Sequence, residues 1–207
     1  MAWKTEKWMA DVFPGESGIW EDYRLLPPRE LSIVSVAVLD SAISEILSLR
    51  LAKFDSEIES FLGVNGDGRA PVSSFGARIQ LALLLGLIDP EDAAALRGLK
   101  QLRNMFAHRV KIDMLSKDIV KVNKVLFANL SKRVERMLIT PRRKAFVEKV
   151  NTVGKTLHVD PKAGEFLITV ALALYQSYFY SIHPHIRRVE FNLPPLSPIE
   201  RNQGEEV

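Results

Sequence analysis

Proline and glycine fall in seven clusters along this chain, and the long segments between the clusters carry apolar residues at helical spacing. The clusters lie at residues 13–18, 26–30, 63–71, 89–92, 140–143, 160–164 and 182–186. No long stretch alternates between apolar and polar residues, which is the pattern of a half-buried strand. The sequence therefore predicts an all-α fold, a compact multi-helix bundle with long buried helices and irregular N- and C-terminal segments.

Capping signals mark where several of these helices are expected to begin. Ser74 can accept a hydrogen bond from the first turn of a helix, and the Asp-Pro pairs at 89–90 and 160–161 join a capping side chain to a proline that suits the first helical position. Apolar residues cover nearly every face of residues 30–54, so this helix should be buried on more than one side. Residues 115–138 instead carry one apolar stripe, as expected for a helix that packs with a single face.

Chain length and composition indicate a single domain. A chain of 207 residues can bury one well-packed core, which we assign to residues 28–183, with an N-terminal arm at 1–27 and an extended tail at 184–207. The absence of cysteine excludes thiol catalysis and disulfides and fits a reducing cytoplasm, where we expect the protein to reside. The most apolar run, 166–182, is shorter than the ~20 residues that cross a bilayer, so no membrane contact is expected.

Basic residues gather in one region of the chain. The net charge is only +3, but residues 117–155 hold eleven Lys and Arg residues against three Asp and Glu residues. Such a region can contact an acidic partner, either a regulatory protein or nucleic acid. A lysine-rich face opposite an apolar stripe is more often a solvated helix face, and no recognised DNA-binding motif accompanies it. The candidate contact residues are Lys117, Lys121, Lys124, Lys132, Arg136, Arg142, Arg143 and Lys144.

No metal or cofactor site is predicted. Residues 63–68, GVNGDG, are similar to part of a calcium loop. Gly63 and Ser74 would occupy its first and last ligand positions, where calcium loops carry acidic side chains. His183 and His185 lie two residues apart without a nearby pair of carboxylates, which is more typical of a turn at a helix end than of a metal site.

The segment LRNMFAHRV, residues 102–110, places two arginines, an asparagine and a histidine close together. On a helix, Arg103 lies at the edge of the apolar stripe, whereas Asn104 and His108 share a face that points away from it. Arg103 and His108 can meet on one face only if the helix ends or distorts near Ala107. The group can act as a polar clamp in a helical core, as a binding site or as a catalytic site.

Two further charged residues interrupt apolar helices. Asp40 lies in VAVLDSAIS and Arg78 lies in SFGARIQLALLL. A charged side chain in a buried helix is costly unless it is paired. Both side chains should therefore be mostly buried and within hydrogen-bond reach of each other or of the 103–108 group. The predicted polar cluster consists of Asp40, Arg78, Arg103, Asn104 and His108.

The blocks AVLDSAISEIL, APVSSFGARIQLALLLGLID and LKQLRNMFAHRV follow one another in an order and at a spacing that resemble the mannitol operon repressor (MltR-like) family. The resemblance covers roughly residues 30–140. It implies an all-helical regulator linked to repression of sugar-alcohol uptake genes. It implies no DNA-binding domain, so the regulatory outcome is expected to be reached through a protein partner.

A broader resemblance is to the HEPN superfamily of helical domains, whose nucleases carry an arginine, often followed by a polar residue, and a histidine a few positions later. Arg103, Asn104 and His108 match that pattern. This resemblance implies a metal-independent RNase in which His108 is the general acid or base, Arg103 stabilises the phosphate charge and a second copy of the chain completes the site.

The leading interpretation is a non-enzymatic regulator without a cofactor that acts through protein contacts, as a monomer or a homodimer. The alternatives are the HEPN-type RNase and a direct DNA binder that uses residues 117–155. The aromatic residues of 161–182 place that helix either at the centre of the core, which we expect, or at a subunit interface.

Overall fold

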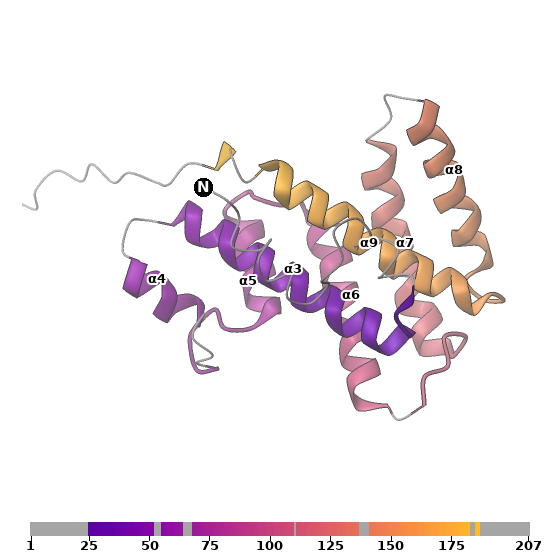
Figure 1. Cartoon of the computed structure of the whole chain (residues 1–207), viewed down its shortest axis with the longest axis horizontal. Helices are drawn as coiled ribbons and strands as arrows, with labels where there is room; N and C mark the ends of the chain where they lie inside the picture. The colour runs from indigo at the N-terminus through magenta and orange to yellow at the C-terminus, as the bar shows by residue number, and fades with distance from the viewer. Residues whose placement is uncertain are drawn as a thin grey trace, which may run out of the picture.

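Seven helices make up most of the part of the chain that the structure describes (Figure 1). This computed structural model describes residues 25–51, 55–63, 68–109, 111–136, 141–182 and 185–186. The helices are α3 (Pro28–Arg50), α4 (Asp55–Leu62), α5 (Phe75–Leu84), α6 (Pro90–His108), α7 (Lys117–Glu135), α8 (Pro141–Thr156) and α9 (Pro161–Ile182). These ranges contain no strand, so the predicted all-α fold is confirmed.

The helices begin where the capping side chains predict. The Ser74 hydroxyl accepts a hydrogen bond of 3.2 Å from the Ala77 N–H at the start of α5. The Asp89 carboxylate accepts one of 2.7 Å from the Asp92 N–H at the start of α6. Each bond satisfies a donor that the first turn of a helix leaves without an intrahelical partner. α9 begins at Pro161, as its Asp-Pro signal predicts.

A tight turn ends α5 and sets the start of α6. Gly86 has a φ of 67°, a left-handed conformation that favours glycine. The N–H groups of Gly86 and Leu87 then donate hydrogen bonds to the carbonyls of Leu83 and Ala82, at 3.0 and 2.9 Å. The chain therefore reverses within a few residues and brings α6 against α5.

α3 and α9 lie side by side through the middle of the bundle (Figure 1). α6 packs on α3 with one face and on α7 with another, and α8 covers α7 and α9. The buried apolar side chains of these helices form one continuous cluster. The aromatic rings of Tyr175 and Phe179 on α9 are fully buried in that cluster. α9 is therefore a core helix, as its aromatic content predicts.

α7 packs with a single face, as its apolar stripe predicts. The opposite face is exposed and carries Lys117, Lys121 and Lys124. One row of side chains reaches the core, and its buried members are Ile119, Val122, Leu126, Leu130 and Val134.

α3 is also long and apolar enough to cross a bilayer, judged by length and composition alone. In this fold 61% of its most apolar window is buried. α5, α6 and α9 all pack against α3, so its apolar composition is accounted for by contacts on several sides.

Several predicted features lie outside the described residues. They include the N-terminal arm before Leu25, the tail after Ile186 and His183. Most of the GVNGDG loop lies outside as well, and so do the side chains of Arg142 and Arg143, although their backbone belongs to α8.

Candidate functional site

Arg78 and Asp40 form the centre of the predicted polar cluster. The buried Arg78 guanidinium donates a hydrogen bond of 2.7 Å from Nη1 to Asp40 Oδ1. The same guanidinium donates to the Leu62 carbonyl at 2.6 Å and to the Val72 carbonyl at 3.1 Å. One side chain of α5 therefore holds α3, the end of α4 and the segment before α5. This arrangement is a structural clamp.

Burial and nearby arginines have opposite effects on the pKa of Asp40. Burial raises the pKa of its carboxyl above the ordinary value, and the hydrogen bond and charge of Arg78 oppose that rise. The charge of Arg103 acts in the same direction as that of Arg78. Arg103 thus takes part in the electrostatics of the cluster, although no hydrogen bond joins it to Asp40 among the described residues.

The remaining members of the predicted cluster lie apart from the clamp. Arg103 is exposed, and its Nη1 donates a hydrogen bond of 3.1 Å to Oδ1 of the half-buried Asn104. His108 is exposed and is the last residue of α6. Within the described part of the chain, its side chain makes no hydrogen bond or ion pair. The prediction of one five-residue cluster is therefore corrected: Arg78 and Asp40 pair, and His108 stands in solvent.

The end of α6 explains the position of His108. The helix ends at His108, and the backbone of Arg109 is extended. Arg29 of α3 donates a hydrogen bond of 3.4 Å to the Ala107 carbonyl in the last turn. The core stripe of α6 faces α3 and α7, so a residue on the opposite face at the helix end points into solvent.

A second polar cluster, which sequence patterns do not reveal, surrounds Asp92 in the first turn of α6. Asp92 is only 1% exposed. Its carboxylate accepts hydrogen bonds from the Tyr175 hydroxyl at 3.1 Å and from Arg133 Nη1 at 3.2 Å. The Arg133 guanidinium also stacks 4.0 Å from the centroid of the Tyr178 ring. Helices α6, α7 and α9 therefore meet at one buried ion pair.

Burial controls the protonation equilibria in this cluster. Desolvation raises the pKa of Asp92, and the nearby charge of Arg133 opposes the rise. Desolvation also raises the pKa of Tyr175, and the negative charge of Asp92 adds to that effect. The Tyr175 hydroxyl is thus held in its protonated form, which lets it act as the donor to Asp92.

Two residues of the predicted basic surface, Lys132 and Arg136, form ion pairs with acidic residues at the start of α6. Arg136 contacts Asp89 at 2.5 Å and Glu91 at 3.6 Å, and Lys132 lies 3.7 Å from Glu91. Burial tends to raise the pKa of Asp89, but the Asp92 N–H and Arg136 outweigh it and lower that pKa. Lys132 and Arg136 therefore hold α7 on α6 instead of forming part of a free basic stripe.

Lys121, one of the exposed lysines of α7, lines a groove between α6 and α7 that has a volume of about 600 Å³. Apolar side chains form its floor, namely Met105, Val122 and the 50% exposed Val125. Its charged lining residues are Arg97, Arg109, Asp118 and Lys121. Arg109 and Asp118 pair at 3.0 Å across the groove.

No group of three or more potential metal ligands occurs among the described His, Asp and Glu residues. Comparison of the chain with protein-family models, with curated proteins and with solved structures finds no match.

Proposed function

We propose that this chain is a non-enzymatic helical regulator that binds an acidic protein partner in the groove between α6 and α7. The groove supports this proposal because it combines an exposed apolar floor with a positive rim. Protein interfaces pair an apolar centre with a polar border. A regulator of this kind agrees with the resemblance to MltR-like proteins, which implies repression of sugar-alcohol uptake genes through protein contacts.

The positive charge around the groove favours an acidic partner. Arg97, Arg109 and Lys121 line it together with a single acidic residue, Asp118. The neighbouring Lys117 and Lys124 are exposed on the same face of α7 and add to the positive potential there. An acidic amphipathic helix could place apolar side chains on Met105 and Val125 and carboxylates along this rim.

Direct DNA binding has less support. A phosphate-binding surface needs basic side chains that continue along the backbone of the duplex. On α7 the exposed lysines extend from Lys117 to Lys124, but Lys132 and Arg136 are engaged by Asp89 and Glu91. The apolar floor beside Lys121 also suits a protein side chain better than a phosphate.

A metal-independent RNase is the second candidate. The observation that favours it is the exposure of Arg103 and His108 beside the half-buried Asn104, at the end of α6. These side chains are accessible to a substrate or to a second copy of the chain. Within one molecule, however, Arg103 bonds to Asn104 and His108 has no orienting partner in the described part of the chain. In many nucleophile–base pairs a third group orients the base, and here a second copy of the chain would have to supply it.

Co-purification from native cell extract tests the leading proposal. The wild type should retain an acidic protein, and raising the salt concentration should weaken its capture. Lys121→Glu and Val125→Asp should each lose it. Lys144→Glu, at an exposed position of α8 away from the groove, should retain it and serves as the matched control.

A genetic measurement completes the test. In a strain that lacks the chain, wild type and Lys144→Glu should restore repression of sugar-alcohol uptake genes, and the two groove variants should not. Repression and partner capture that survive both Lys121→Glu and Val125→Asp would contradict the proposal.

A further inference from the structure

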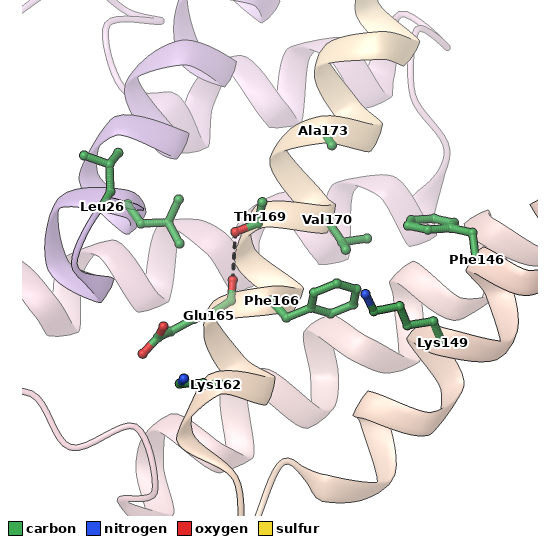
Figure 2. A pocket seen from close by; sticks show the side chains of 10 residues that line it. Leu26, Phe146, Lys149, Lys162, Glu165, Phe166, Thr169, Val170 and Ala173 are labelled. Atoms are coloured by element: carbon green, nitrogen blue, oxygen red, sulfur yellow. Dashed lines mark hydrogen bonds between the residues drawn. The ribbon is translucent and has the colours of Figure 1, made fainter. Parts of the chain in front are cut away.

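A second groove lies between the start of α3 and α8, with α9 as its floor (Figure 2). Its volume is about 560 Å³. Leu26 stands on one side and Phe146 on the other, and Phe166 and Val170 rise from α9 between them. A groove of this size is comparable to sites that hold large apolar groups.

The described residues leave part of the groove's apolar lining exposed to solvent. Phe146 is 39% exposed, and Phe166 is only partly buried. Lys149 lies over the Phe166 ring, with Nζ 5.1 Å from the ring centroid. Lys162 is exposed at the end of the groove where α9 begins. Glu165 also lines the groove, so its charged lining residues are two lysines and one glutamate. An occupant that brings an apolar or aromatic side chain together with negative charge fits this lining.

The chain itself supplies a segment of this chemistry next to the groove. The described chain begins at Leu25, and the adjacent Leu26 already lines the groove. The preceding residues 16–23 read ESGIWEDY, with three acidic residues, no basic residue and the side chains of Ile19, Trp20 and Tyr23.

We propose that residues 16–23 bind in the groove between α3, α8 and α9 of the same molecule, with Trp20 against Phe166 and with Glu21 and Asp22 near Lys149 and Lys162. Trp20 lies six positions before Leu26, and an extended chain over that distance spans roughly 20 Å. A short tether gives the segment a high effective concentration, so it outcompetes a free peptide of similar sequence.

Tryptophan fluorescence tests this inference in the full chain. All three tryptophans, at positions 3, 8 and 20, precede Leu25, and only Trp20 lies in the 16–23 segment. Trp3→Phe and Trp8→Phe leave Trp20 as the single reporter. Its emission should lie at shorter wavelength than that of a solvated tryptophan and should be protected from acrylamide quenching.

Groove variants of this reporter protein separate binding from folding. Phe146→Ser and Lys149→Glu should shift the Trp20 emission to longer wavelength while circular dichroism stays unchanged. Lys155→Glu, exposed on α8 and absent from the groove lining, should leave the emission as it was. Glu21→Lys should restore the short-wavelength emission of Lys149→Glu, because the charge pair is then present with its signs exchanged.

Three results would overturn the inference. The first is a solvated Trp20 in the reporter protein. The second is an unchanged emission in both folded groove variants. The third is a short-wavelength emission that disappears on dilution together with a dimer, since it assigns the groove to the segment of a second copy.

Discussion

The guanidinium of Arg78 donates a 2.7 Å hydrogen bond to the carboxylate of Asp40, 38 residues earlier in the chain, and also holds the carbonyls of Leu62 and Val72. One buried side chain thus links α3, α4 and α5. The pair is a structural element, and its removal is expected to act on folding first.

Arg78→Met should lower the free energy of unfolding by about 3–5 kcal/mol, the range found when one partner of a buried ion pair is removed. The change leaves Asp40 without its partner and two carbonyls without a donor. Urea unfolding measures the loss. Arg97→Met is the control, because its exposed side chain bonds only to Gln80 on the described surface, and should cost no more than about 0.5 kcal/mol. Equal losses in the two variants would mean that Arg78 is no clamp.

Two substitutions in the Asp92 cluster should lower the free energy of unfolding by different amounts. Tyr175→Phe should cost about 1.5–3 kcal/mol because it removes a hydrogen bond to a charged group. Asp92→Ala should cost about 3–5 kcal/mol because it leaves Arg133 without its closest partner. When Asp92 is already Ala, Tyr175→Phe should have little further effect. Thermal or urea unfolding of the four proteins checks this, and fully additive losses would contradict a direct bond.

The clamp and the cluster show what the sequence can and cannot predict. Asp40 and Arg78 stand out because each interrupts an apolar helix, and the cost of an unpaired buried charge requires a partner. Asp92 gives no such signal, since an acidic residue in a first turn is usual on the surface of a helix. Arg133 likewise looks like part of a solvated basic face. Only the packing of α6, α7 and α9 brings these two residues together.

The starts of α5 and α6 could be predicted from the sequence, whereas the exposure of His108 at the end of α6 could not. Ser74 and Asp89 were predictable caps because their bonds are local, within three residues of sequence. The exposure of His108 depends on where α6 ends and on what packs beside its last turn. No local pattern fixes those contacts, so the clamp that the sequence suggests for His108 is absent from the described structure.

Acid stability should depend on Asp89, whose pKa is lowered from the ordinary 3.8 by the Asp92 N–H and Arg136 against an opposing effect of burial. A lowered pKa stabilises the fold at pH values above 3.8, and this contribution is lost as the pH falls through the folded-state value. Asp89→Asn keeps a capping acceptor and removes the charge. The variant should be less stable than wild type at pH 7, and the difference should shrink below about pH 4.

Unfolding measured between pH 7 and pH 3 checks this dependence. The charge of Asp89 is one of the causes that raise the pKa of Asp92, so Asp89→Asn also makes that rise smaller and offsets part of the loss at pH 7. Asp118→Asn, which removes an exposed partner of Arg109, is the control and should have little effect at any pH. A difference that grows on acidification would be inconsistent with a lowered pKa at Asp89.

His108→Ala decides between the regulator and the RNase. His108 is exposed at the end of α6, so the substitution should change the free energy of unfolding by no more than about 0.5 kcal/mol. We expect the purified wild type to show no metal-independent cleavage of RNA, and we expect His108→Ala to repress as wild type does, because the proposed partner site lies in the groove between α6 and α7. His158→Ala, at another exposed histidine, is the matched control.

An RNase would give a different result. The wild type and His158→Ala would both cleave RNA in the presence of a chelator. His108→Ala would stay folded, but its single-turnover rate would fall by about 10²–10⁴-fold, the usual contribution of a general acid or base. That result would move the function from the groove to the end of α6, where Arg103 and Asn104 already lie within reach of solvent.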